Sequence, residues 1–269
     1  MPVYNEEEFV EETIDSVLNQ TFENFEFIIV DDKSTDETRE ILKEYESNDR
    51  IRLFFNDENR GWAATVNRGI RFLKGEYIAL VDSADLCSPE RLEKQLNFLK
   101  GNGAVSVVGS YHHWIDEEGR IVGSYKFPEE PEEVEAKILG FASVTVSPSL
   151  MIERSVFEKV GLFNPDYVQS PDYEFFVRLI KNGIRIKNLP DFLLSVRKRK
   201  GRGTPERIKK AFSDNAKIKI RYLPDLMSLR NVLYAIVSVL ILLFPAQILR
   251  KILNLSIKEG LFRDSLLGV

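Results

Sequence analysis

The sequence predicts an α/β protein with a mostly parallel sheet and helices on both faces. Through residues 1–103, short apolar, β-branched segments alternate with longer segments of helical periodicity. The clearest example is FEFIIVDD at 25–32, which STDETREILKEYES at 34–47 follows almost directly. Consecutive parallel strands need crossover connections of this kind, so the alternation favours a parallel, Rossmann-like sheet.

The individual elements follow from local sequence signals. Ser34, Thr35 and Asp36 can cap the helix that follows them, Gly75 suits a helix end, and Pro89 suits a first helical turn. We expect strands at 25–32, 50–56, 76–82 and 104–110, and helices at 34–47, 61–75 and 88–103. The pattern is less regular afterwards, where we expect strand pairs at 109–128 and 184–200, helices at 131–141 and 170–183, and a strand with a short helix at 147–163.

The beginning of the chain is unusual for this fold class. An amphipathic helical segment, EEEFVEETIDSVLNQTF at 6–22, has only MPVY and Asn5 before it. Pro2 cannot donate a ladder hydrogen bond. We therefore expect either a chain that begins inside a strand of the natural protein or an unusually short first strand.

Composition argues against several classes of protein. The 269 residues carry a formal net charge of -5, whereas a general nucleic-acid binder would present a basic surface. Basic residues cluster only late, in VRKRKGRGTPERIKK at 196–210. The single cysteine, Cys87, excludes an internal disulfide and fits a reducing compartment. Because MPVYNEEEF is too acidic for a secretory signal, we expect a cytoplasmic protein.

The C-terminal part changes character. Residues 231–249 carry no charge, and their length lies between that of a membrane-spanning helix and that of a buried helix. Pro245 interrupts the segment, and basic residues flank both ends, so its orientation is unreadable: Arg221 and Arg230 before, Arg250 and Lys251 after. Two interpretations stay open, a membrane-associated helix at the inner face of the cell membrane and a core or oligomer-interface helix.

Four carboxylates fall at the ends of predicted strands. Asp31 and Asp32 end one strand, and Asp82 and Asp85 follow another. Ligands of open α/β sheets bind at the carboxyl ends of strands. Hard oxygen ligands of this kind suit Mg²⁺ or Mn²⁺.

Three segments together resemble the family 2 glycosyltransferases: PVYNEEEFVEETIDSVLNQTFENFEFIIVDDKSTDET, NDENRGWAATVNRGIRFLKGEYIALVDSAD and SPERLEKQ. These are inverting enzymes of the GT-A fold that use nucleotide-diphospho-sugars, and in them an apolar strand precedes PVYN. The resemblance covers about residues 1–200 and is strongest in the first half. It implies a nucleotide-sugar-binding half at 1–103 and an acceptor-binding half at 104–200. Beyond the resemblance, the composition predicts a basic and apolar helical tail at 201–269.

The resemblance also implies which residues bind the donor. Pro2, Tyr4, Asn5 and Glu6 match the family's first loop, and Asp32 matches its base-contacting carboxylate. Tyr4 and Asn5 could instead form a simple turn, and Asp32 could cap the following helix. Gly61 and Asn67 match a segment beside the nucleotide, although Asn67 and Arg68 could equally be satisfied surface groups.

The family's metal motif reads D-x-D-D at the end of this strand, and here it is altered. Asp82 and Asp85 match, while Ala84 replaces an aspartate expected near the ribose or metal. Asp85 is the better-matched direct ligand for Mg²⁺ or Mn²⁺, and Asp82 is a second ligand or an indirect one. The alternative is a helix N-terminal turn that carries two solvated aspartates.

The general base of the family corresponds to Asp172 in SPDYEFFVRL. Pro171 replaces the usual glutamate, Glu174 is a weaker candidate base, and Arg178 is expected to brace the helix. Asp172 could alternatively be an early-turn residue favoured by the helix dipole.

A closing arginine of the family corresponds to Arg197, and Lys198 or Arg199 stands where a histidine is usual. These cations could steady the leaving diphosphate, bind anionic lipid, or form a solvated run. His112 and His113 have no metal-ligand spacing.

We therefore expect a metal-dependent inverting glycosyltransferase that moves a sugar to a glycan or lipid-linked hydroxyl acceptor. The main alternative is a degenerate, non-catalytic GT-A module that binds a nucleotide-sugar or a partner, which Ala84 and Pro171 favour. A sugar nucleotidyltransferase would need a glycine-rich basic loop, and PVYNEEEF has no glycine.

Overall fold

The first part of the chain forms a three-stranded parallel sheet. The structure is a computed structural model that describes residues 1–140, 143–198 and 204–249. The sheet has the order β1-β2-β3, and its strands are β1 (Pro2–Val3), β2 (Phe27–Asp31) and β3 (Ile51–Phe55). The crossover helices are α1 (Val10–Leu18) and α2 (Thr38–Glu44), as the alternation predicted. The first strand is short, with only Pro2 and Val3 in register with β2.

The second sheet is mixed, so the expectation of a mostly parallel sheet was wrong for this half. Its order is β4-β8-β6-β9-β5, with β7 beside β6. Only β6 and β9 pair in parallel, and the other pairs are antiparallel. Antiparallel pairs need no crossover, so the β6–β7 hairpin closes through a tight turn at Gly119, whose φ is +78°. The strands are β4 (Tyr77–Ala79), β5 (Leu86–Cys87), β6 (Val107–Ile115), β7 (Ile121–Tyr125), β8 (Met151–Glu153) and β9 (Ile186–Arg197).

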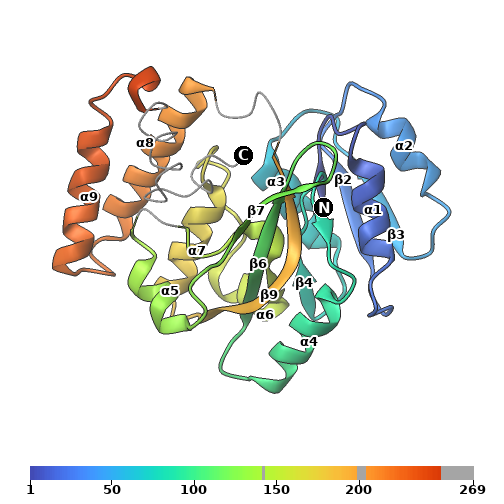
Figure 1. The fold of residues 1–269 in the computed structure, drawn as a ribbon, viewed down its shortest axis with the longest axis horizontal. Helices are drawn as coiled ribbons and strands as arrows, with labels where there is room; N and C mark the ends of the chain where they lie inside the picture. Colours follow the sequence, from blue (N-terminus) through green and yellow to red (C-terminus); the bar gives the residue numbers. More distant parts are fainter. Residues whose placement is uncertain (141–142, 199–203, 250–269) are drawn as a thin grey trace.

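Helices cover both faces of this sheet (Figure 1). Adjacent residues of β6 point to opposite faces, so Val107 packs in the cluster that includes Phe175, while Val108 packs with Leu99. The first cluster joins the sheet to α3, α6, α7 and α8, and the second joins it to α4. The helices are α3 (Trp62–Phe72), α4 (Arg91–Gly101), α5 (Pro131–Lys137), α6 (Arg154–Val160), α7 (Pro171–Lys181) and α8 (Pro205–Tyr222), and Ser147–Ser149 form a 3₁₀ turn.

A cavity of about 680 Å³ lies between the two sheets. Its lining includes Ile28 and Val30 of β2 and Ile78 of β4, together with Leu80. Among the described residues, no ladder pairs the β1-β2-β3 sheet with the second sheet. The two sheets are therefore joined through side chains and loops.

The chain ends in two packed helices. The helix α8 begins at a cap in which the Thr204 hydroxyl accepts the Arg207 N–H, and α9 spans Leu229–Ile241. Within the described residues, no helix combines the length and apolar character that crossing a bilayer requires. The predicted segment 231–249 is helical only in part, because α9 ends at Ile241 and a turn follows it. The flanking cations Arg250 and Lys251 lie outside the described residues.

A lysine is buried between these two helices. Lys219 of α8 is 3% exposed, and its ammonium donates to the Ser238 hydroxyl of α9 at 3.1 Å. Burial lowers the pKa of Lys219 from 10.5 to about 7. The unfolded chain keeps this proton up to about pH 10.5, whereas the folded chain loses it above about pH 7. Between these two pH values the folded state therefore binds fewer protons than the unfolded state.

We predict that the free energy of unfolding rises between pH 7 and pH 10 and that Lys219→Met flattens this rise. Urea denaturation at several pH values measures both slopes. The control is Lys217→Met, because Lys217 is exposed two positions earlier and should keep the wild-type slope. Equal slopes for Lys219→Met and wild type would contradict the prediction.

Candidate functional site

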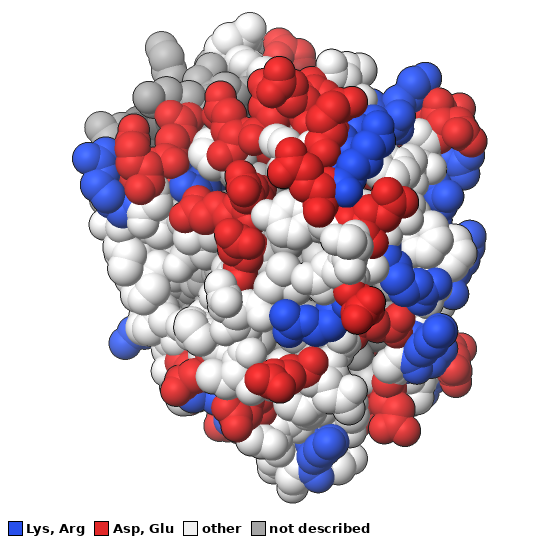
Figure 2. All heavy atoms as spheres, turned by 90° about the vertical axis from the view of Figure 1, so that its right-hand side faces the viewer, with Lys and Arg blue, Asp and Glu red and all other residues white. Residues whose placement is uncertain are grey.

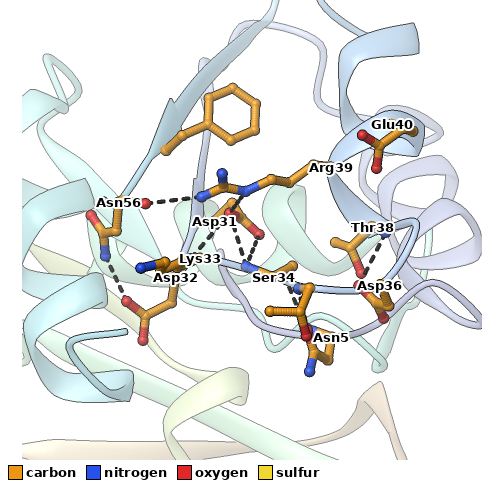
Figure 3. Close-up of polar contacts among 12 residues, drawn as sticks. Asn5, Asp31, Asp32, Lys33, Ser34, Asp36, Thr38, Arg39, Glu40 and Asn56 are labelled. Carbon is orange, nitrogen blue, oxygen red and sulfur yellow. Dashed lines mark hydrogen bonds and ion pairs between the residues drawn. The ribbon is translucent and has the colours of Figure 1, made fainter. Parts of the chain in front are cut away.

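The carboxyl end of β2 carries two buried aspartates with different partners (Figure 3). The Asp31 carboxylate accepts the backbone N–H groups of Lys33 and Ser34 and the guanidinium of Arg39, whose Nε lies 2.6 Å away. Arg39 also donates to the backbone carbonyl of Asn56 at 2.9 Å. Asp31 thereby fixes the turn into α2 and ties it to the end of β3.

Asp32 holds the loop that precedes α3. Its Oδ1 accepts the Asn56 amide at 2.7 Å and the Arg60 N–H at 2.8 Å, and its Oδ2 accepts the Gly61 N–H at 2.8 Å. Gly61 has φ +80°, a conformation that favours glycine. The carboxylate expected to contact the nucleotide base is thus bonded to the loop around it, and these bonds hold the loop before α3 in shape.

The predicted first loop lies against the turn after β2. Asn5, at φ +53°, donates its backbone N–H to the Ser34 hydroxyl and accepts the Thr35 N–H on its side-chain oxygen at 2.8 Å. The backbone N–H of Glu6 donates to the Thr38 hydroxyl at 2.8 Å. These bonds bring the two loops to one edge of the sheet. Of the other predicted residues, Pro2 pairs with β2 and the Tyr4 side chain is 46% exposed.

Asp82 and Asp85 lie on one tight turn but in different surroundings. Asp85 is 4% exposed, and its Oδ1 accepts the Arg197 N–H at 3.1 Å. Asp82 is half-buried, and its Oδ1 accepts the indole N–H of Trp62 at 3.0 Å. The structure therefore makes Asp82, and not the better-matched Asp85, the more accessible carboxylate of the pair.

Asp172 lies close to Asp82 although the two are far apart in the sequence. It occupies the first turn of α7, just after Pro171, and its Oδ1 accepts the Tyr173 N–H at 2.7 Å. Burial raises the pKa of the Asp172 carboxyl to about 6. The negative charge of Asp82 adds to this rise, and the hydrogen bond from the Tyr173 N–H opposes it. At neutral pH the carboxylate can accept a proton, as a general base must.

Three residues considered in the sequence analysis, Asn67, Arg178 and Glu174, have hydrogen-bond or ion-pair partners within the protein. The Asn67 amide donates to the Phe163 carbonyl at 2.7 Å and accepts the Phe163 N–H at 3.0 Å. Arg178 braces α7, as expected, through an ion pair with buried Glu174 at 2.9 Å and a bond to the Leu162 carbonyl at 2.7 Å. Glu174 also accepts the Tyr222 hydroxyl, which leaves it poorly placed for a general base.

Arg197 is buried at the junction of several elements. Its guanidinium donates to the backbone carbonyls of Ala84 and Glu117 at 3.0 and 2.8 Å and forms an ion pair with Glu12. It stacks over the Phe9 ring at 4.7 Å. Arg197 thereby holds the Asp82–Asp85 turn. Lys198 lies over the Trp114 ring, and Arg199 falls outside the described residues.

His112 packs in the interior of the second sheet. His112 is fully buried among the rings of Trp114, Tyr125 and Phe127, and burial lowers its pKa to about 4. It therefore packs as a neutral aromatic side chain.

The turn at Asp82 and Asp85 can hold a divalent cation only with help from a ligand. Within the described residues, no group of three or more His, Cys, Asp and Glu side chains could hold a metal ion. Mg²⁺ at nucleotide sites is typically bound by one or two carboxylates, substrate phosphates and water. This pair of carboxylates fits a cation that arrives with a diphosphate, and does not fit a preformed protein cage.

The sequence interpretation missed three residues that shape this edge of the sheet. Asn56 is 1% exposed and links Asp32 to the Thr65 hydroxyl, and its carbonyl accepts Arg39. The second residue is Thr65, which accepts the bond from Asn56, and the third is Trp62, whose indole N–H donates to Asp82. Asn56 is the last residue of the predicted strand 50–56, just as Asp32 and Asp82 end theirs, and that position was the available signal.

Comparison with known proteins identifies the family. Residues 1–161 match the family described as Glycosyl transferase family 2. The chain belongs to this family. Over 201 residues it is 35% identical to the uncharacterized glycosyltransferase MJ1057 of Methanocaldococcus jannaschii, an alignment that covers 73% of this chain and 69% of that protein. The resemblance seen in the sequence is confirmed, and the protein is a glycosyltransferase.

Two solved structures share its fold. S. aureus TarS 1-349 in complex with UDP matches with a TM-score of 0.63 and 23% identity, over 81% of this chain and 64% of that one. Mannosyltransferase PcManGT from Pyrobaculum calidifontis, in complex with GDP-Man and Mn²⁺, matches with a TM-score of 0.64 and 19% identity, over 95% and 79%. The family 2 chain thus has an α/β GT-A-like fold and spans less than two thirds of the TarS chain.

The role of Asp32 gives a test. We predict that Asp32→Asn lowers the free energy of unfolding by about 1–3 kcal/mol, because an amide nitrogen would face N–H donors or one donor would lose its charged acceptor. Urea denaturation measures the loss. Asp57→Asn, an exposed change in the same loop, should have no measurable effect. If both variants lost the same stability, the proposed role of the Asp32 bonds would be wrong.

Proposed function

We propose that this glycosyltransferase moves a hexosyl group, with inversion, from a nucleotide-diphospho-sugar to a hydroxyl acceptor in a metal-dependent reaction. The observation that carries the proposal is that Asp172, a half-buried carboxylate, lies within electrostatic range of Asp82 in the Asp82–Asp85 turn. A base and a metal-binding carboxylate must lie on either side of a reacting anomeric carbon.

The donor would bind at the edge formed by the first loop, the end of β2 and the Asp82–Asp85 turn. Asn5 and Glu6 are fixed there by bonds to the turn after β2, and Asp32 holds the opposite loop in shape. The nucleotides named in the two solved structures, UDP and GDP-Man, support a nucleotide-diphospho-sugar donor.

The cation would be Mg²⁺ or Mn²⁺, held directly by Asp82, with Asp85 and Arg197 keeping the turn in place. When bound, it would offset the charge of the diphosphate that leaves. The Mn²⁺ in the mannosyltransferase complex supports this choice. Ala84 contributes no ligand, so water and phosphate oxygens would complete the coordination.

Asp172 would take the proton of the acceptor hydroxyl. The hydroxyl oxygen forms a bond to the anomeric carbon on the face opposite the diphosphate, while the bond from that carbon to the diphosphate oxygen breaks. The proton stays on Asp172, and the nucleoside diphosphate leaves with the bonding electrons. A pKa of about 6 suits a base that works near neutral pH.

The acceptor would be a growing glycan or a lipid-linked saccharide at the cytoplasmic face of a membrane. This part of the proposal rests on the apolar C-terminal segment. A second candidate function is a degenerate module that binds a nucleotide-sugar without turnover. Ala84 and the lack of a three-ligand cluster among the described residues favour that candidate.

Binding can be tested before the donor is known. We expect one of UDP, GDP, dTDP or their sugars to raise the melting temperature in the presence of Mn²⁺, because a ligand that binds only the folded state stabilises it. Asp82→Ala should abolish the metal-dependent shift, and the exposed Asp57→Ala should keep it. If no nucleotide shifted the melting of folded protein, the donor site would be disproved.

Turnover separates the enzyme from the degenerate module. We expect Asp172→Asn to bind the donor normally and to release nucleoside diphosphate roughly 10²–10⁴-fold more slowly, because the amide cannot accept the proton. Water or a supplied hydroxyl compound can serve as the acceptor. Asp166→Asn, an exposed change just before α7, is the control. Donor binding without turnover in the wild type would establish the degenerate module instead.

A further inference from the structure

The outer face of α9 is apolar and uncovered. Leu229, Leu233, Ile236 and Leu240 recur at helical spacing and are 90, 56, 52 and 52% exposed. Leu243, in the turn after the helix, is 79% exposed. Only Ala235 and Ser238 of α9 are buried, so the helix uses its small residues against the protein and presents its large ones to the outside.

This helix can lie on a bilayer but cannot cross one. Its 13 residues extend over about 20 Å, against a hydrocarbon core of about 30 Å. An interfacial helix buries one apolar face at the level of the headgroups and needs no such length. Within the described residues, no element packs over this face, since its large side chains are more than half exposed.

The distribution of charge selects an anionic surface. Between Leu226 and Leu249 the sequence has no acid and one cation, Arg230. From Lys198 to Arg221 it has ten Lys and Arg against two Asp and Glu, and Lys217 and Arg221 of α8 are exposed. Of the acids near α9, Asp225, Glu132 and Glu133 form ion pairs with lysine or arginine, which leaves the exposed Glu135.

The acidic face of the molecule lies at the other end. Figure 1 places α9 at one end of the long axis and α1 and α2 at the other. Figure 2 shows that second end, where acidic side chains gather along the upper part. The exposed acids in and beside α1 and α2 are Glu7, Glu8, Glu11, Glu12, Asp15, Glu37, Glu40, Glu44 and Glu46. A molecule seated on α9 therefore keeps this acidic end away from a negative surface.

We propose that the outer face of α9 docks on an anionic lipid bilayer as an interfacial helix, with the exposed cations of α8 and Arg230 near the headgroups. The apolar side chains supply affinity through burial, and the cations supply a salt-dependent attraction. The proposal does not depend on the donor or on catalysis.

Co-sedimentation of the full chain with vesicles tests the proposal. We expect binding to phosphatidylcholine vesicles that contain phosphatidylglycerol, weaker binding to phosphatidylcholine alone, and weaker binding to the mixed vesicles in high salt. Leu233→Asp and, separately, Leu240→Asp should each reduce binding by about tenfold or more. Each removes an apolar group that the bilayer would bury and adds a negative charge that the anionic lipid repels.

A matched control exists in β7. Val122 is 56% exposed, the same fraction as Leu233, so Val122→Asp adds the same charge to an equally exposed apolar position away from α9. It should bind the mixed vesicles like the wild type, and melting curves confirm that the variants are folded. The proposal is overturned if the wild type stays in the supernatant, or if Leu233→Asp and Leu240→Asp bind normally. Light scattering can also detect a dimer. If the wild type were a dimer that Leu233→Asp converts to a monomer, and did not bind vesicles, the face would be assigned to a second copy of the chain.

Discussion

Two adjacent carboxylates at the end of β2 hold together the part of the fold that carries the site. Asp31 and Asp32 are almost completely buried, and a buried charge is tolerated only when it is hydrogen-bonded. Asp31 bonds toward α2, and Asp32 bonds toward the loop before α3. Asn56 closes the arrangement, because its side chain bonds Asp32 and its carbonyl accepts Arg39.

This use of carboxylates has a consequence for ligand binding. Acceptors that are occupied by backbone N–H groups give shape and rigidity, and they are less available to a nucleotide. In the site that we propose, the cation would then be bound by a less occupied group, of which half-buried Asp82 is the clearest. A site of this kind separates the residues that build it from those that perform chemistry.

Local patterns in the sequence predicted the elements well, because periodicity and turn residues are local properties. They also placed Asp172 at the start of α7. They predicted the antiparallel pair at 109–128, but not the other antiparallel pairs of the second sheet, since strand direction there depends on which distant strand becomes the neighbour. The strand pair expected at 184–200 is the single strand β9. The local patterns left the roles of Asn67 and Arg197 open between ligand contacts and other roles, and both side chains bond backbone carbonyls distant in the sequence. The partner of a polar side chain is a long-range property, and residue type alone does not specify it.

Arg197 limits how this molecule can move. One guanidinium at the end of β9 joins α1 of the first sheet, through Glu12, to the turn at Ala84 and to the loop after β6. Of these bonds, the ion pair with Glu12 is the one that reaches the first sheet, and the Glu12 side chain is 54% exposed. A rotation of one sheet against the other would break that pair and leave the buried guanidinium without its charged partner, so Arg197 resists such a rotation.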